Sequence, residues 1–491
     1  MEGLGPIRVS KKDSEDGQPL SPMARIFHQP YGDVYTMTIM GFNTPINHLV
    51  FKASLRHSLL KHPRFSCLPV LENGGEMRWV KTEVNLDNHV RVPVVDPNME
   101  SPDKFVEDYA SNLSKTTITK SIPLWDVHLL NVKTSEAEST GIFRIHHSLG
   151  DGISLMSLLL SCSRKASDPE ALPTIPTIKR RNPRNSGGLT SWQFLLKLWW
   201  LVLLCWNTIV DVLILLGTIF FLEDTKTPLK GTLPLGLAQR RFVHRTISLD
   251  DVKLVKNAMG TTINDVMAAI TQAGLSSYLN RKYGDDKTYN KGAEKNNNNL
   301  PNNIRLRAAL AVNIRPSAGI QAFDDMMRKD NKARWGNHIG CVLFPFTIAL
   351  REDPLDYIRV AKVTGDRKKS TLEAKFTYSM VKFSPKCFTN KISSFPNRIT
   401  LWFSNVPGPV EEISYFGHTV AFIALSAYGQ PNALVIHVVS YANKMKIALS
   451  VDENIISDPH QLCDDLQNSL DLMKNAVITN QRTDPKLYTT G

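Results

Sequence analysis

The sequence FRIHHSLGDG at residues 143–152 ends an apolar strand with two histidines and starts a new helix, which we expect over residues 153–163. Imidazole titrates near neutrality, so a histidine at a strand end can accept a hydroxyl proton while an acyl group is transferred. We predict that His147, the second of the pair, is this base. The alternative interpretation is a histidine pair that only ends a strand before an Asp-Gly turn.

The predicted catalytic set is His147, His146 and Asp151, with His146 acting through the geometry of the loop. Asp151 lies four residues after His147, where a buried carboxylate can hold the loop by pairing with an arginine rather than by touching substrate. Gly152 is expected to let the backbone turn tightly into the following helix.

This stretch resembles the HHxxxDG signature of CoA-dependent acyltransferases, a superfamily that includes chloramphenicol acetyltransferase, plant alcohol acyltransferases and peptide-synthetase condensation domains. Further blocks resemble the wax ester synthase/diacylglycerol acyltransferase family of plants and bacteria, and they follow the family order along nearly the whole chain. These blocks are Pro19-Leu20-Ser21-Pro22, Pro123-Leu124-Trp125, Asn264-Asp265-Val266, Asn313-Ile314-Arg315-Pro316, Gly336-Asn337 and Ser404-Asn405-Val406-Pro407-Gly408-Pro409.

The resemblance implies a mixed α/β fold of two chloramphenicol-acetyltransferase-like domains with a channel between them. It implies an enzyme that uses fatty acyl-CoA as co-substrate, holds no permanently bound cofactor, and esterifies a long-chain alcohol or diacylglycerol. Arg315 is then the expected partner of Asp151, and its alternative is a surface arginine before a proline. The remaining expected supports of the site are Asn264, Asp265, Ser404 and Asn405. The alternative for Asn264 and Asp265 is helix capping, and the alternative for Ser404 and Asn405 is a surface turn.

Length and composition agree with two packed domains. The chain has 491 residues, which is too long for a single hydrophobic core of ordinary size. With 42% hydrophobic and 21% charged residues, it can bury two cores. The net charge of +12 favours anionic partners such as CoA phosphates or a membrane face. Nucleic acid is not expected because the basic residues are scattered. The six cysteines lie far apart without a CxxC pair, so neither a disulfide framework nor a metal site is expected.

We divide the chain into a disordered N-terminus at 1–20, a first acyltransferase domain at 21–163, a Pro-rich basic linker at 164–191, an apolar segment at 192–222 and a second acyltransferase domain at 223–491. Periodicity and turn signals predict the individual elements. Strands are expected at 33–42, 125–132, 141–145, 241–248, 307–314, 399–403, 420–426, 433–441 and 444–451, and helices at 45–61, 102–115, 263–282 and 459–477.

The apolar segment is long enough to cross a bilayer as a helix. Asp211 would cost about 2.5 to 3.5 kcal/mol at mid-membrane, but the surrounding Leu, Ile, Val and Phe residues outweigh that cost. One crossing would separate two domains that must meet across a channel. We therefore expect a hairpin or in-plane insertion, with arms at 192–205 and 207–222 and Asn207 near the bend. A buried core helix is the alternative.

The sequence analysis thus predicts a wax ester synthase or diacylglycerol acyltransferase on the cytosolic face of the endoplasmic reticulum, with the plasma membrane as the alternative site. Two other functions stay open. An alcohol acyltransferase for small or aromatic acceptors would share the histidine chemistry but would not need the apolar segment. A non-enzymatic membrane protein that binds lipid would not need His147.

Overall fold

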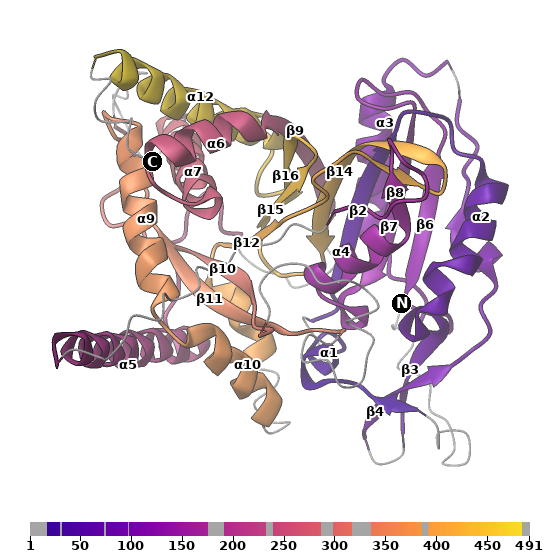
Figure 1. Ribbon diagram of the computed structural model, residues 1–491, viewed down its shortest axis with the longest axis horizontal. Helices are drawn as coiled ribbons and strands as arrows, with labels where there is room; N and C mark the ends of the chain where they lie inside the picture. Colours follow the sequence, from indigo (N-terminus) through magenta and orange to yellow (C-terminus); the bar gives the residue numbers. More distant parts are fainter. Residues whose placement is uncertain are drawn as a thin grey trace.

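Two β-sheets form the centres of two lobes that lie side by side (Figure 1). The computed structural model describes residues 17–29, 32–72, 75–96, 98–174, 191–231, 239–285, 298–316, 335–384 and 391–483. Residues 1–16 of the N-terminus predicted to be disordered (1–20) and most of the linker lie outside these residues. The prediction is wrong for residues 17–20, where Gln18 and Pro19 form a strand and Leu20 is buried.

The first lobe is built on a seven-stranded sheet with the order β5-β6-β7-β2-β14-β13-β8. Its strands are β5 (Val90–Arg91), β6 (Trp125–Leu130), β7 (Ser139–His146), β2 (Tyr35–Phe42), β14 (His418–Tyr428), β13 (Ile413–Tyr415) and β8 (Ser163–Lys165). A small sheet of β1 (Gln18–Pro19), β4 (Met77–Lys81) and β3 (Cys67–Leu71) lies beside it. The helices of this lobe are α1 (Pro22–Ile26), α2 (His48–His57), α3 (Pro102–Ser114) and α4 (Gly152–Ser161).

Two strands from the C-terminal part of the chain complete this first sheet, which corrects the domain division at residue 223. β14 runs antiparallel to β2, with Tyr428 opposite Tyr35 and Val420 opposite Phe42. Ile423 of β14 is fully buried in the first core. The first lobe therefore depends on residues that the sequence analysis assigned to the second domain.

The second lobe is built on a six-stranded sheet with the order β11-β10-β12-β15-β16-β9. Its strands are β11 (Ile339–Phe346), β10 (Leu306–Asn313), β12 (Leu401–Val406), β15 (Leu434–Tyr441), β16 (Lys444–Asp452) and β9 (Arg240–Ser248). Its helices are α6 (Leu249–Ala258), α7 (Ile263–Asp285), α9 (Leu355–Lys369), α10 (Glu373–Phe383) and α12 (Pro459–Thr483). α7 is buried on most of its faces because α6, α9 and α12 pack around it. The two sheets meet where β14 lies against β15 and β16.

The apolar segment forms one continuous helix, α5 (Ser191–Phe220), which projects from the edge of the second lobe (Figure 1). The predicted hairpin with a bend at Asn207 is therefore wrong. No proline interrupts the stretch, and Thr208 donates its hydroxyl to the Leu204 carbonyl across the expected bend. Among the described residues, α5 is the one helix that is long and apolar enough to cross a membrane.

The other predicted elements agree with the structure to within a few residues, with two differences of detail. α2 starts at His48 after the cap Asn47, whose side-chain oxygen accepts from two backbone amides, rather than after Thr44. β12 ends at Val406, three residues beyond the predicted end. The mixed α/β, two-sheet architecture is confirmed.

Candidate active site

His147 lies at the start of the short helix η5 (His147–Leu149), directly after β7, and the second lobe holds its ring. Its Nδ1 is 3.2 Å from Oδ1 of Asn337. The Asn337 amide nitrogen donates to the backbone carbonyls of His147 and Ser148, so this amide is oriented with its oxygen toward the ring. Nδ1 therefore carries the proton, and Nε2 keeps the lone pair that a base needs.

The environment of His147 keeps the ring neutral. Burial lowers its pKa below the ordinary 6.5, and this effect outweighs the opposite influence of its hydrogen bonds and of Asp151. The ring of Phe27 stacks on the imidazole with centroids 4.3 Å apart and fixes its plane. A neutral, oriented imidazole is the form that can accept a proton near pH 7.

His146 has no free ring nitrogen and lies outside the cavity described below. Its Nδ1 accepts from the backbone N–H of Ser148, so its Nε2 carries the proton and donates to Asp33 at 2.9 Å. The carboxyl of Asp33 is held ionised: burial works against the charge, but the bond to His146 lowers the pKa of the group. His146 thus positions the loop and does not reach the reacting atoms.

Asp151 and Arg315 form the predicted pair, and both side chains are buried. Two guanidinium nitrogens donate to the two carboxylate oxygens at 2.9 and 3.2 Å. The Asp151 carboxylate also accepts from the backbone N–H groups of Ser154 and His338. The bond from Ser154 makes Asp151 the N-cap of α4. The pair therefore joins the HHxxxDG loop of the first lobe to the end of β10 in the second.

Gly152 has a different role from the predicted one. Its backbone is not in the left-handed region, so the turn itself does not require glycine. A side-chain carbon at this position would instead lie 3.3 Å from Cγ2 of Val406, within the wall of the cavity. The missing side chain keeps the space between the loop and β12 open.

A cavity of about 210 Å³ extends from His147 between the two lobes. Most of its lining is apolar and comes from α1, β2, β14, β10, β11, β12, α10 and α5. A second cavity of about 80 Å³ lies between α4 and the first sheet. The two cavities share Thr36, Gly152 and Leu425, so they adjoin beside the HHxxxDG loop.

His437 is the residue that the sequence analysis missed. It lies on β15 opposite Ser404 of β12 and lines the same cavity as His147. Burial and the nearby His147 lower its pKa to about 4, so the ring is neutral. Its Nδ1 is buried without a hydrogen-bond partner among the described residues. The alternation of the strand showed only that His437 faces one side of the sheet; the meeting of the two sheets makes that side the cavity wall.

Of the four remaining predicted support residues, Asn264, Asp265, Ser404 and Asn405, one lines the cavity and three make contacts within the second lobe. Ser404 lines the cavity. Asn405 donates its amide to Asn264 at 2.7 Å, which ties β12 to the start of α7. Asp265 accepts from the backbone N–H of Thr262, whose hydroxyl accepts from the Asp265 N–H, so the two form a capping box. Capping, the plain alternative, is thus what Asp265 does.

The described residues contain no cluster of His, Cys, Asp or Glu side chains that could hold a metal ion. A cysteine, Cys341, also lines the cavity. Burial raises the pKa of its thiol, which keeps the sulfur protonated and a poor nucleophile. The cavity therefore offers a neutral histidine for proton transfer and a protonated thiol that is a poor nucleophile.

Comparisons with known proteins identify the family to which the chain is similar. The wax ester synthase/diacylglycerol acyltransferase catalytic domain matches residues 47–267, and the WS/DGAT C-terminal domain matches residues 335–474. Wax ester synthase/diacylglycerol acyltransferase 4 of Arabidopsis thaliana is 47% identical, over 96% of this chain and 93% of that protein.

Two solved structures share the fold. The wax ester synthase/diacylglycerol acyltransferase from Marinobacter aquaeolei VT8 has a TM-score of 0.60 at 18% identity, over 94% of this chain and 100% of that one. A starter condensation domain of rhizomide synthetase, solved with C8-CoA and Leu-SNAC, has a TM-score of 0.53 at 11% identity, over 96% and 97%.

Proposed function

Because this chain belongs to the wax ester synthase/diacylglycerol acyltransferase family, it is an acyl-CoA-dependent acyltransferase, and we propose that it esterifies long-chain alcohols and, as a second acceptor, diacylglycerol. The single observation that supports the choice of acceptor is the apolar cavity that starts at His147. Such a lining suits alkyl chains and offers few partners to a polar acceptor.

In the proposed mechanism His147 is the general base. Its Nε2 takes the hydroxyl proton while the alcohol oxygen attacks the thioester carbonyl carbon of acyl-CoA. The tetrahedral intermediate then breaks its C–S bond, and the proton on His147 passes to the departing CoA sulfur. Asn337 holds the other ring nitrogen throughout, so the ring does not need to change tautomer. The products are an ester and free CoA, and no acyl-enzyme forms.

His437 is the side chain that we assign to the developing oxyanion. It lines the cavity with His147, and its neutral ring can donate one N–H. A neutral donor suits this place because a second cation would oppose protonation of His147 during the reaction. Substrate would also supply the hydrogen-bonding group that the buried Nδ1 atom of His437 lacks among the described residues.

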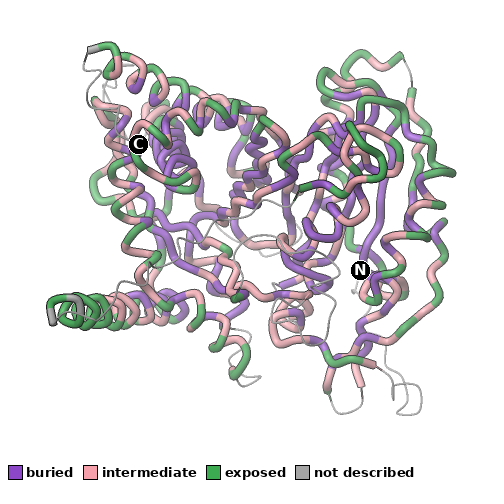
Figure 2. The backbone as a smooth tube through the Cα atoms, viewed as in Figure 1, coloured by how far each residue is buried: buried purple, intermediate pink, exposed green. Residues whose placement is uncertain are grey.

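The outer half of α5 is proposed to attach the enzyme to the cytosolic face of the endoplasmic reticulum, lying in the plane of the membrane. This half of the helix is exposed along its length (Figure 2). It carries four exposed tryptophans, Trp192, Trp199, Trp200 and Trp206, which suit an interface. Lys197 in the same half of the helix favours anionic headgroups. An in-plane helix keeps the chain before and after α5 on one side of the membrane, which is required because β2 and β14, on either side of α5 in the sequence, pair in the first sheet.

The acceptor is tested with purified protein and labelled palmitoyl-CoA, offered hexadecanol, diacylglycerol and short alcohols separately. Ester formation with hexadecanol that exceeds that with short alcohols supports the proposal. Preference for a short or aromatic alcohol would instead identify a small-acceptor acyltransferase, and no ester with any acceptor would favour a lipid-binding protein.

The attachment is tested by changing Trp199, Trp200 and Trp206 to serine together. Binding to phosphatidylcholine/phosphatidylserine vesicles should fall by about tenfold or more, because large apolar surfaces no longer leave water. A matched control changes three exposed apolar residues away from α5, Val92, Val94 and Leu472, to serine. Equal binding of both variants would place the attachment elsewhere.

A further inference from the structure

The cavity that starts at His147 reaches the membrane-attachment helix. Leu215 of α5 is one of its lining residues and is 1% exposed. Around Leu215 lie Phe395 of η6 (Phe395–Arg398) and Met380 of α10, which line the same cavity. The inner half of α5 is therefore a wall of the substrate cavity and not only an anchor.

The two halves of α5 differ in what they contact. The outer half is exposed to solvent, and the inner half meets the second lobe (Figure 2). The boundary is a polar seam. Asp211, fully buried, accepts from Arg367 at 2.7 Å and lies 3.0 Å from Lys368. Asn207 donates to the Ser370 carbonyl, and Thr208 accepts from the backbone N–H of Leu372. Ion pairs and backbone contacts thus fix the rotation of the helix about its axis.

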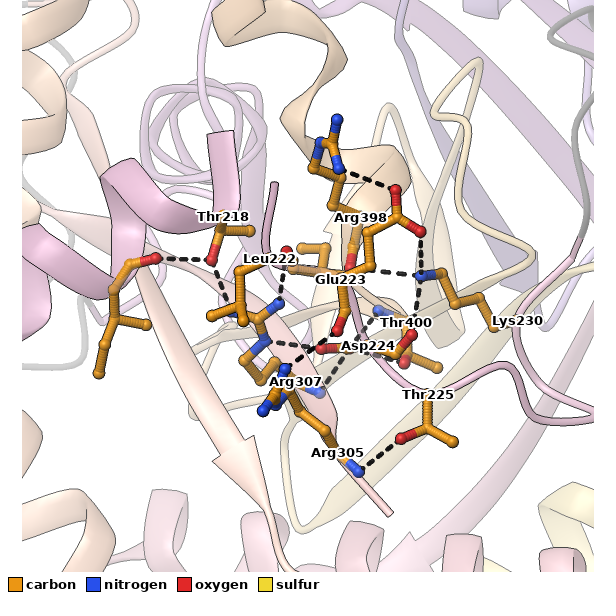
Figure 3. A network of polar contacts seen from close by, with 12 residues as sticks. Thr218, Leu222, Glu223, Asp224, Thr225, Lys230, Arg305, Arg307, Arg398 and Thr400 are labelled. Carbon is orange, nitrogen blue, oxygen red and sulfur yellow. Dashed lines mark hydrogen bonds and ion pairs between the residues drawn. The ribbon is translucent and has the colours of Figure 1, made fainter. Parts of the chain in front are cut away.

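A second polar network fixes the end of α5 (Figure 3). Arg307 of β10 donates to Thr218 on the last turn of the helix at 2.5 Å and to Asp224 just beyond it at 2.6 Å. The other Asp224 oxygen accepts from the backbone N–H and the hydroxyl of Thr400, the residue before β12. β10 and β12 also line the cavity, so this network ties the helix to the strands that face it.

Leu215 lies between these two fixed points, so the turn of α5 that carries it is held from both sides. It packs in a small apolar cluster with Ile219, Ala309, Leu343 and Ile399. A large apolar side chain on a fixed helix limits the space in the cavity that it borders.

The reaction needs room for two alkyl chains, and the structure has two adjoining apolar cavities. The cavity under α4 is enclosed by the core of the first lobe and has no lining residue from α5. The cavity that Leu215 lines borders α5, the helix proposed to attach to the membrane. An alcohol dissolved in the bilayer arrives at α5, whereas acyl-CoA arrives from water with its charged carrier.

We propose that the arm between His147 and α5 binds the alkyl chain of the acceptor, and that Leu215 is a specificity residue that limits the length of this chain. The proposal rests on the proposed function, since it needs an alkyl acceptor. The α4 cavity then takes the fatty acyl chain of acyl-CoA. One helix thus combines membrane attachment with the choice of acceptor.

The test compares Leu215→Ala and Leu215→Phe with the wild type on dodecanol, hexadecanol and eicosanol, using palmitoyl-CoA. Leu215→Ala should raise the kcat/KM ratio of eicosanol to hexadecanol about tenfold, and Leu215→Phe should lower it by a similar factor, because room for a few carbon atoms is gained or lost. Neither change should alter the preference among lauroyl-, palmitoyl- and stearoyl-CoA by more than about twofold.

Leu213→Ala is the matched control, because it removes the same side chain from the same helix at a position that is 62% exposed. It should leave both chain-length profiles unchanged. Loss of stability alone cannot shift the two Leu215 variants in opposite directions, so opposite shifts support the proposal even if both variants melt earlier. A shift confined to the acyl-CoA profile, or none in either profile, would overturn it. Failure of the proposed function looks different, since the wild type would then make no long-chain ester.

Discussion

The two ends of the substrate cavity are held in place by polar contacts, but they present different surfaces to substrate. At one end His147 and His437 offer ring nitrogens, and contacts between the lobes orient the loop. Where the cavity meets α5, Leu215 is an apolar lining residue, and the polar residues that fix the helix, Asp211 and Arg307, are not among the residues that line the cavity. The comparison teaches that chemistry needs oriented polar atoms, whereas chain-length selection needs a rigid apolar wall.

The first prediction concerns the reactive end and carries the largest expected effect. His147→Ala should reduce kcat by about 10²- to 10⁴-fold, because a positioned base is lost. Folding should be little affected because His147 lines the cavity and is not part of either hydrophobic core. Turnover and thermal melting of the purified variant check both statements. Near-normal turnover would remove His147 from the mechanism and end the comparison with Leu215.

The second prediction concerns the pair that holds the loop. Truncating either Asp151 or Arg315 to alanine should lower the free energy of unfolding by about 3 to 5 kcal/mol, since the remaining charge is buried without its partner. The double variant should lose less than the sum of the two. Denaturant titration of all three variants measures this coupling, and strictly additive losses would contradict it.

A third prediction tests whether His437 takes part in the chemistry or only lines the cavity. His437→Ala should reduce kcat by about 100-fold through loss of an oxyanion donor, with the preference for acceptor length unchanged. Steady-state kinetics with two alcohols check it, and His437→Gln, which keeps an N–H donor, should recover part of the rate. A changed length preference with normal kcat would make His437 a volume-setting residue like Leu215.

The smallest expected effect is on pH dependence. The base acts in its neutral form, and burial lowers the pKa of His147. The value of kcat/KM should therefore be constant near pH 7. It should fall only at a pH below 6.5, the value at which an ordinary histidine is half protonated. The profile of kcat/KM from pH 5 to pH 8 shows this. An acidic limb at or above 6.5 would mean that the ring is not buried during catalysis.

Much of the reactive end could be predicted from the sequence because its signals are local. The strand, the two histidines, Asp151 and the start of α4 follow one another in a few residues. The partner Arg315 came from resemblance to a family, since no spacing along the chain shows that it meets Asp151. His437 could not be found in this way, because a single histidine on a strand carries no signal of its own.

The sequence by itself determined many of the helices and strands, although not β11, α9 or α10, together with the HHxxxDG loop and the presence of one long apolar segment, because periodicity and turn chemistry act over neighbouring residues. Only the tertiary structure decided that β14 joins the first sheet, that α5 is continuous, and that Leu215 faces the cavity. An alternating pattern shows that a strand has a buried face but not which strand it pairs with. Likewise, the sequence of α5 shows an apolar surface, and the contacts of Asp211 and Thr218 decide which part of it faces protein.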